Sequence, residues 1–321
     1  MTQPEPAAPA VVPPPRPPGR LRGTISAEGA FLWGAAAIGA GLASWFFVTA
    51  PLFLVPVEAA AEAPAEREYA PLISPVMLPG PGAVFEAVPR VFRERKLVPN
   101  TLVTLRRVVF GFGLAALVGV PLGVAAACFP AVRAFFYPVT IFGRNIPVAA
   151  LIPLTFFLFG IGEFQKVMFL FVASVAFVIS DATAAVLEVP QRYVDTALTL
   201  GASRLQIILK VLTPLAAPVI FNSLRLLFGL AFGYVMLAEL VKFGSDSGGL
   251  GDLINVSQRR GEREPILIVL ILIPLLAYAI DRTLWWLQCD LFPYRYGGKG
   301  RLKRIWQRLF HSAAPSTEFR P

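Results

Sequence analysis

The stretch EVPQRYVDTALTLGASRLQIILKVLTP, residues 188–214, decides how this chain is organised. It is the only long amphipathic segment, and hydrophobic runs flank it on both sides. Pro190 suits the first turn of a helix, because its missing N–H has no partner to lose there. Gly201 can take the left-handed conformation that ends this helix, and Ser203 can cap a second one. The pattern predicts two short surface helices joined at a glycine, between two membrane spans.

Apolar residues recur at helical spacing in both predicted helices, with polar residues between them. In the first helix they are Val194, Ala197, Leu198 and Leu200. In the second helix they are Leu205, Ile208, Leu209 and Leu212. Such an elbow is typical of a docking element. The alternative is an interfacial amphipathic helix anchored to lipid headgroups.

The elbow resembles the cytoplasmic loop of bacterial ABC-importer permeases, which reads Glu-Ala-Ala, three residues, Gly, nine residues and Ile-x-Leu-Pro. The matching positions here are Asp195, Thr196, Ala197, Gly201, Val211, Thr213 and Pro214. Three of them depart from the family pattern: Asp195, Thr196 and Thr213. In the family this loop sits in a groove of the ATPase. The resemblance therefore implies an ABC ATPase dimer as partner, with these coupling residues: Asp195, Ala197, Gly201, Ala202, Ser203 and Pro214.

Composition excludes several classes of protein. The chain has 321 residues, of which 56% are hydrophobic and 15% charged, too apolar for an ordinary soluble protein. The net charge of +9 suits bases that flank membrane spans better than a nucleic-acid partner. Two cysteines without metal-ligand spacing and one histidine, His311, predict neither a metal site nor an enzyme. We expect no cofactor on this chain and ATP on the partner subunit.

Hydrophobic runs predict six transmembrane helices, at about Ala27–Ala50, Leu102–Cys128, Phe135–Phe159, Phe164–Leu187, Pro214–Val241 and Pro265–Leu287. A signal peptide is the alternative for the first run, which is however longer than a signal core. Together with the resemblance, the runs indicate an all-α membrane protein with the fold of an ABC type I importer permease.

The expected organisation has five parts. Residues 1–24 form a disordered Pro-rich cytoplasmic tail, 25–50 the first transmembrane helix and 51–96 a periplasmic loop. Residues 97–290 form a five-helix permease core with the coupling loop at 188–213, and 291–321 a basic cytoplasmic tail. Both tails are rich in arginine, so the positive-inside rule puts both termini in the cytoplasm. Positive residues on the predicted outer side, from Arg90 to Arg107, oppose that rule.

Two further segments resemble the nitrate/sulfonate/taurine branch of these permeases. They are LPGPGAVFEAVPRVF at 78–92 and RNIPVAALIPLTFFLFGIGE at 144–163. The glycine-rich loop SDSGGLGDLI at 245–254 resembles the external loop before the last span. Small residues recur every fourth position at Gly111, Ala115, Gly119 and Gly123, and again at Gly229 and Gly233, which predicts close helix packing.

The candidate residues for a translocation path are Arg106, Arg107, Pro147, Pro153 and Asn222. Prolines at membrane depth interrupt a helix beside a cavity or at a packing kink. Arg106 and Arg107 either form an outward basic ring that attracts an anion or extend to the interface. Arg225 and Glu239 lie about 21 Å apart along one helix, so each needs a partner elsewhere. Asp181 is expected to meet headgroups or water.

The sequence thus predicts the permease subunit of an ATP-driven importer in the bacterial inner membrane, for a small anion such as nitrate, bicarbonate or a sulfonate. Its expected partners are the ATPase dimer, a second permease copy or close homologue, a periplasmic or lipid-anchored solute-binding protein, and lipid. The alternative is a secondary transporter driven by an ion gradient, a class that places acids and broken helices at the midplane of repeated halves. No internal repeat is visible, and Glu239 lies near the end of a span.

Overall fold

The structure is a computed structural model that describes residues 27–50, 53–56, 67–70, 73–74, 77–241 and 248–296. The predicted tail at 1–24 and most of the predicted basic tail lie outside these residues. The chain divides into two compact units, Met1–Pro81 and Gly82–Pro321. Each unit is described by itself.

The first unit contains one long apolar helix and a small hairpin. Helix α1, Ala27–Thr49, is long enough to span a bilayer, as predicted. Strand β1, Phe53–Pro56, pairs antiparallel with β2, Arg67–Ala70. These strands lie in the segment that the sequence predicted as a loop. The indole Nε1 of Trp45 donates to the carbonyl of Pro79 at 3.2 Å, which ties the end of α1 to the chain before the second unit.

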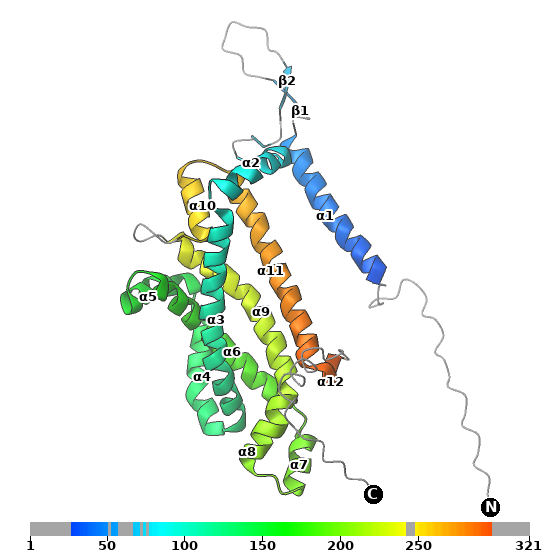
Figure 1. The fold of residues 1–321 in the computed structure, drawn as a ribbon, viewed down its shortest axis with the longest axis vertical. Coiled ribbons are helices and arrows are strands. Elements are labelled where there is room, and N and C mark those ends of the chain that lie inside the picture. The colour runs from blue at the N-terminus through cyan, green and yellow to red at the C-terminus, as the bar shows by residue number, and fades with distance from the viewer. Residues whose placement is uncertain are drawn as a thin grey trace, which may run out of the picture. The chain divides into compact units, whose positions relative to one another are not determined.

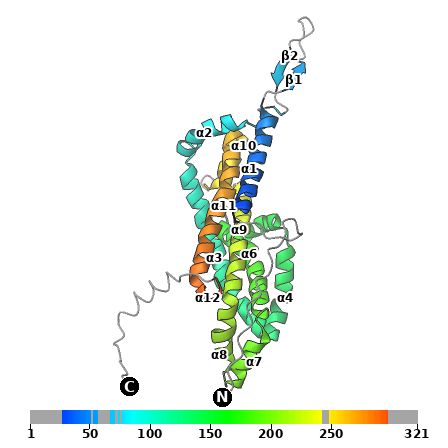
Figure 2. The ribbon, with the colours of Figure 1, turned by 90° about the vertical axis from the view of Figure 1, so that its right-hand side faces the viewer.

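The second unit is a bundle of long helices (Figure 1). Its helices are α2 Pro81–Arg93, α3 Leu97–Cys128, α4 Pro130–Asn145, η1 Val148–Ala150, α5 Leu151–Phe159, α6 Glu163–Leu187, α7 Gln191–Thr199, α8 Arg204–Ile207, the π-helix η2 Ile208–Leu212, α9 Thr213–Leu240, α10 Leu250–Arg259, α11 Glu264–Leu291 and α12 Pro293–Tyr296. Figures 1 and 2 agree that α10 lies at one end of this bundle and that α7 and α8 lie at the other.

Two helices occupy segments that the sequence predicted as loops. Helix α2 buries Val84, Ala87 and Val91, which recur at helical spacing in the segment predicted as the end of the periplasmic loop 51–96. Helix α10 begins at Leu250, inside the predicted glycine-rich loop, and buries Leu250 and Leu253. In both cases an amphipathic pattern lies beside residues that normally mark turns. The burial of one apolar face stabilises the helix over a loop.

Helices α3 and α6 pack closely along the predicted stripe of small residues. A Cβ atom added at Gly111 would lie 2.8 Å from the carbonyl oxygen of Val167 in α6. At Gly119 it would lie 2.7 Å from Val178, and at Gly123 2.6 Å from Ala182. The close packing predicted for this stripe is confirmed, whereas nothing described lies within 4 Å of a Cβ atom added at Gly229 or Gly233, where it was also predicted. Because the contacting residues rise together in number, α3 and α6 run parallel.

Because α3 and α6 run parallel, the chain segment that connects the end of α3 to the start of α6 must return along the length of the bundle. That return is made by α4 and by η1 with α5, which are bent by 99° at the break. Gly143 of α4 contacts Ala176, whereas Arg133 bonds to the far end of α3, so α4 runs antiparallel to α6. The interruption predicted from the prolines of the third span is confirmed, and a bent helix pair forms this part of the bundle.

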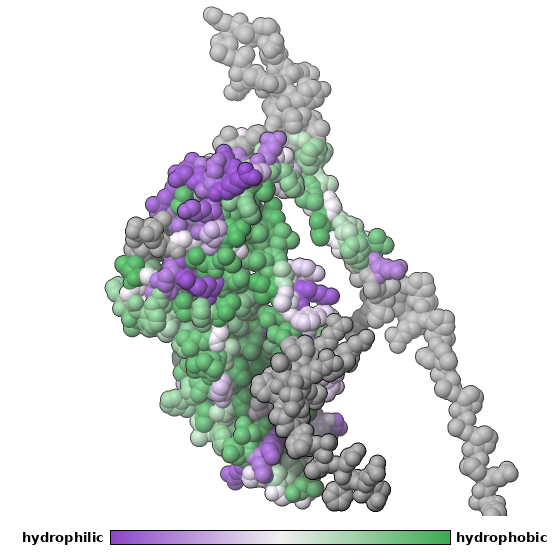
Figure 3. Space-filling view, viewed as in Figure 1, coloured by the Kyte–Doolittle hydropathy of each residue, from purple (hydrophilic) through white to green (hydrophobic). Residues whose placement is uncertain are grey.

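With the bent pair counted as one span, the described residues contain six spans; five are single helices long and apolar enough to cross a membrane. Hydrophobic residues cover the sides of the bundle in Figure 3, and hydrophilic residues gather over α2 and α10. Apart from the hairpin, the described residues contain only helices. The predicted all-α membrane fold is confirmed.

Candidate functional site

The elbow, residues 188–213, has the local structure that its sequence predicts. Gly201 has a φ of +76° and ends α7. The N–H of Ala202 donates to Ala197 at 3.0 Å, and that of Gly201 donates to Leu198 at 2.9 Å, the two bonds of a Schellman motif. Ser203 caps α8: its hydroxyl accepts from the N–H of Gln206, whose side chain accepts from the N–H of Ser203. The joint is thus fixed on both sides of the glycine.

The sequence predicted a separate short helix for the second arm of the elbow, and this prediction is wrong. Helices α8, η2 and α9 form one continuous helical segment from Arg204 to Leu240. Pro214 has no N–H to donate, and the π-helical turn at Ile208–Leu212 directly precedes it. The hydroxyl of Tyr294 in α12 donates to the carbonyl of Pro214 at 2.7 Å. The elbow therefore leads directly into the fifth span.

The elbow leaves an apolar surface without a partner in the described chain. Its exposed apolar side chains are Leu198, Leu200, Leu205 and Leu209. Leu200, next to the glycine joint, is 82% exposed. Of the predicted coupling residues, Ala197 is buried and Ala202 is half-buried, while Asp195, Gly201, Ser203 and Pro214 are exposed. Asp195 accepts a hydrogen bond from Gln191 at 3.1 Å.

A buried ion cluster joins three helices at the other end of the bundle. The guanidinium of Arg107 in α3 donates to Glu163 of α6 at 2.9 Å and to Glu239 of α9 at 2.7 Å. It also donates to the carbonyl of Gly248 at 2.8 Å. Glu239 accepts further bonds from Thr104 and from the N–H of Gly251, each at 2.9 Å. The side chains of Arg107 and Glu239 are 1% and 0% exposed.

This cluster corrects the interpretation of the two neighbouring arginines. Arg107 neither extends to the interface nor forms an outward ring, because two carboxylates enclose it. Arg106 is 59% exposed and lies 3.5 Å from Glu163. The expectation that Arg225 and Glu239 pair with other helices is confirmed: Arg225 lies 2.9 Å from Asp281 of α11. Asp181, expected to meet headgroups or water, is 31% exposed and also lies 3.5 Å from Arg144.

The remaining path candidates do not come together in one site. Pro147 lies at the bend between α4 and η1. Pro153 lines an apolar cavity of 630 Å³ between α5 and the end of α9. Asn222 is half-buried in α9, 17 positions before Glu239 and thus about 26 Å from it along the helix. The predicted path residues are therefore spread over the length of the bundle.

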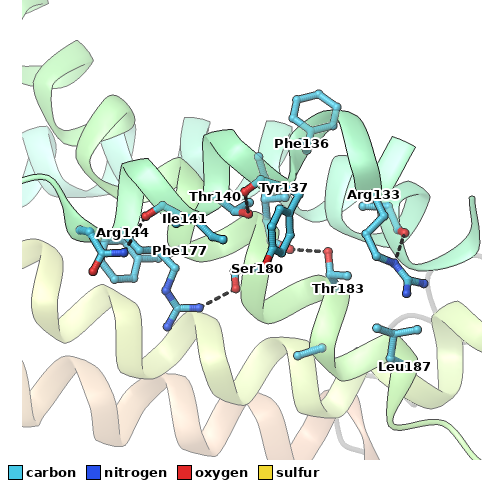
Figure 4. Close-up of a pocket in the computed structure, with 14 residues that line it drawn as sticks. Arg133, Phe136, Tyr137, Thr140, Ile141, Arg144, Phe177, Ser180, Thr183 and Leu187 are labelled. Carbon is cyan, nitrogen blue, oxygen red and sulfur yellow. Dashed lines mark hydrogen bonds between the residues drawn. The ribbon is translucent and has the colours of Figure 1, made fainter. Parts of the chain in front are cut away.

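A cavity of 640 Å³ lies between α4 and α6, with Ala126 of α3 also in its lining, and no predicted site residue lines it. Seven residues of α4 line it, among them the polar residues Arg133, Tyr137, Thr140 and Arg144. Their spacing of four, three and four places them on one helix face. The sequence offered this spacing as a signal of a polar helix face, although aromatic residues lie between the four positions. Figure 4 shows Arg144 and Arg133 at opposite ends of the cavity, with Ser180 and Thr183 of α6 between them.

No group of three or more metal-ligating side chains stands in position to hold an ion within the described ranges.

Residues 119–287 match the family described as binding-protein-dependent transport system inner membrane component. This match covers more than half of the chain, including the elbow. The chain belongs to this family. It is similar to a putative ABC transporter permease protein of Methanocaldococcus jannaschii, with 30% identity over 69% of this chain and 84% of the relative.

Other relatives place the permease in a branch of the family. It is 32% identical to the taurine transport system permease protein TauC of Escherichia coli, over 70% of this chain and 82% of that protein. It is 28% identical to the bicarbonate transport system permease protein CmpB of Synechococcus elongatus, over 61% of this chain and 69% of that protein. The predicted nitrate/sulfonate/taurine branch is confirmed.

Solved structures of ABC transporters share the fold. The inward-facing MetNI methionine ABC transporter aligns with a TM-score of 0.50 and 23% identity, over 59% of this chain and 94% of that chain. An amino acid ABC transporter with histidines aligns with a TM-score of 0.53 and 16% identity, over 63% and 96%. The family match and the similarity to the taurine permease, with several apolar helices, make this chain a multi-pass transport subunit of an ABC importer, and the alternative of a secondary transporter falls away.

Proposed function

We propose that this permease forms the membrane path of an importer for a small anion and receives the motion of an ABC ATPase dimer at the elbow. The continuity of α8 with the fifth span carries this proposal. Since the segment from Arg204 to Leu240 is one helical stretch of 37 residues, about 55 Å long, a displacement at the joint reaches the opposite end of the bundle. Glu239 of the buried ion cluster lies at that end.

The exposed leucines of the elbow are the surface on which we place the ATPase. Four exposed apolar side chains surround a turn that hydrogen bonds fix on both sides of Gly201, and together they form an apolar surface. A groove of the partner that covers this surface removes it from water. ATP binds and is hydrolysed on the partner chain, and this permease binds no cofactor of its own. Closure of the ATPase pair then draws the elbows together and opens the path outward.

A second permease copy, or a close homologue, completes the path along α9. Nothing described lies within 4 Å of a Cβ atom added at Gly229 or Gly233. Leu226 and Leu230 are exposed on the same helix. Small residues with open space beside them allow another helix to approach closely. This face supports the proposal of a paired permease.

We place the elbow and both termini in the cytoplasm and the buried ion cluster at the periplasmic end. The arginine-rich tails support this orientation. A periplasmic or lipid-anchored solute-binding protein then delivers the solute at the end that carries α10. The taurine and bicarbonate relatives support a small anion, such as nitrate, bicarbonate or a sulfonate, as the solute.

The test compares two glycines with similar positive φ angles. Gly201 and Gly261 have φ values of +76° and +72°, and a Cβ atom added at either meets nothing within 4 Å. Gly201→Asp is expected to abolish co-purification of the ATPase and ATP-dependent uptake of labelled taurine or bicarbonate, with unchanged insertion in the membrane. Gly261→Asp, in the turn between α10 and α11, keeps the ATPase. Equal retention of the ATPase by both variants contradicts docking at the elbow.

A further inference from the structure

We propose that the cavity between α4 and α6 is a binding site for the oxyanion group of the transported solute, with Arg144 as its principal ligand. This inference rests on the proposed function, in that it assumes an anionic solute, and it adds a place in the path that the sequence did not indicate. Three hydroxyl-bearing side chains in the lining complete the proposed site: Tyr137 and Thr140 of α4 and Ser180 of α6.

The composition of the cavity favours a negative ligand. Its lining includes two arginines, three hydroxyl-bearing side chains besides Tyr137, and no acidic side chain. The nearest carboxylate, that of Asp181, lies outside the lining and reaches Arg144 at one oxygen, 3.5 Å away. Charge-assisted bonds of arginine are normally about 2.7–2.9 Å long. Asp181 therefore neutralises Arg144 only in part.

Arg144 keeps an open side toward the cavity. Its Nη1 donates to the hydroxyl of Ser180 at 2.5 Å, and its Cζ lies 5.3 Å from the ring centre of Phe177. The side chain is nevertheless 43% exposed. Serine and phenylalanine thus hold the guanidinium in place without a full set of acceptors. An oxyanion that enters the cavity can accept from the remaining N–H groups.

Arg133, at the other end of the cavity, has a structural role. Its Nε and Nη2 donate to the carbonyls of Ala126 and Ala127, at 3.2 and 3.0 Å, at the end of α3. Such bonds satisfy helix carbonyls that have no partner in the helix itself. Arg133 therefore adds positive charge to the cavity mouth, while Arg144 remains the ligand.

The position of the cavity suits a late stage of import. Ser180 lies seven residues before the end of α6, about 10 Å from the elbow end of that helix. Charged side chains inside membrane segments are costly, and they mark solute paths or water-filled cavities. The cavity volume of 640 Å³ falls in the range of ligand pockets, about 300–1,000 Å³. A small anion can stop here before it is released.

A lipid phosphate offers the same chemistry, and basic pockets near the cytoplasmic face also bind lipid headgroups. A second arginine provides a comparison. Arg282 lies in α11 with its Cζ 4.3 Å from the ring centre of Trp285. All residues of its cavity come from that one helix. We assign this single-helix surface to the lipid interface, and the cavity at Arg144, which several helices line, to the solute.

The experiment uses the complex of the permease with its ATPase in phosphatidylcholine nanodiscs. Cys128→Ala and Cys289→Ala remove the native thiols, and Ile141→Cys, at a lining residue without a role in the proposed site, places a reporter in the cavity. The measured quantity is the ratio of modification rates by an anionic and a cationic methanethiosulfonate of similar size. Arg144→Gln is expected to lower this ratio by at least about fivefold, because a unit charge a few ångströms away is lost. Arg144→Lys retains the ratio, and Arg282→Gln is the matched control.

The second arm adds soluble anions and anionic lipid. Nitrate, bicarbonate or taurine is expected to slow modification of the reporter in the protein with Arg144, and to have no effect after Arg144→Gln. An unchanged ratio in Arg144→Gln overturns the proposal. Slowing by phosphatidylglycerol in the nanodisc, with no effect of any soluble anion, also overturns it and assigns the cavity to lipid.

Failure of this inference is distinguishable from failure of the proposed function. If the ATPase co-purifies and hydrolyses ATP while the cavity shows no preference for anions, only the assignment of the cavity is wrong. If no ATPase accompanies the permease, the proposed function is wrong, whatever the ratio of rates.

Discussion

Arg107 and Arg144 both lie in membrane-spanning helices, and their surroundings differ in every respect that decides their roles. Arg107 is 1% exposed and bonded by carboxylates from two other helices and by a carbonyl. Arg144 faces a cavity, with one hydroxyl bond and one distant carboxylate. The first arginine has all its acceptors within the protein, and the second retains donors for a ligand. A charge inside the membrane thus indicates function only when its bonding is incomplete.

The same comparison applies to the two ends of the bundle. The buried ion cluster fixes α3, α6 and α9 together at the end that we place outside. At the other end, the elbow presents exposed leucines, and α4 leaves its polar face open. The closed end provides a fixed point against which a moving elbow can act.

The largest effect is expected at the closed end. Arg107→Ala leaves Glu239 buried without its cation, which in soluble proteins costs about 3–5 kcal/mol. We expect little folded permease in the membrane and a strongly lowered melting temperature in detergent. The control is Arg106→Gln, since that neighbouring side chain is mostly exposed. Equal melting temperatures for the two variants would show that Arg107 is not part of the architecture.

A smaller loss is expected where α3 meets α6. Gly119→Leu drives a side chain into Val178, which lies 2.7 Å from the position of a Cβ atom, and overpacking of this kind costs about 1–3 kcal/mol. Gly113→Leu on the open face of the same helix, with nothing within 4 Å, is the matched control. Thermal unfolding of both variants in detergent measures the difference.

Arg144→Gln is expected to lower stability less than Arg107→Ala and Gly119→Leu do. Its ion pair is long and partly exposed, and such pairs contribute about 0–1 kcal/mol. Uptake of the labelled solute nevertheless falls at least about tenfold, if the loss of one charge-assisted bond costs about 1.5 kcal/mol or more. A variant that loses melting temperature and uptake in parallel would place Arg144 with Arg107 as architecture.

The most local effect, with the least consequence for the rest of the bundle, is expected at the cap of α8. Ser203→Ala removes one half of the capping box and costs the helix start about 1 kcal/mol. Hydrogen exchange of the amides at residues 204–207 should become several-fold faster, while amides of α6 keep their rates. The effect stays local, because the elbow is bonded on the other side of the glycine by the Schellman motif. Uniform acceleration across the bundle would contradict this local role.

Local chemistry was predictable from the sequence, and long-range pairing was not. Pro190, Gly201 and Ser203 define the elbow within 14 residues, so turn and cap preferences sufficed there. The stripe of small residues on α3 likewise predicted close packing, though not that α6 is its partner. Arg107 and Glu239, in contrast, are 132 positions apart, and only the packed bundle shows that they meet.

The bend between α4 and η1 illustrates a middle case. Prolines indicated an interruption in the third span, but they do not encode a bend of 99° or its direction. The polar face of α4 escaped notice for another reason. Its four residues, from Arg133 to Arg144, are separated by phenylalanine, valine and isoleucine, and the regular spacing becomes meaningful only once α6 faces it.

The most direct test of the account is photo-crosslinking from the elbow in intact cells. A photoreactive amino acid in place of Leu200, which is 82% exposed beside the glycine joint, is expected to form an adduct with the ATPase subunit. The same probe in place of Phe157, which is 89% exposed on α5, is expected to form none. Absence of an ATPase adduct at Leu200, or labelling of that position by a membrane-impermeant reagent from outside the cell, would contradict the account.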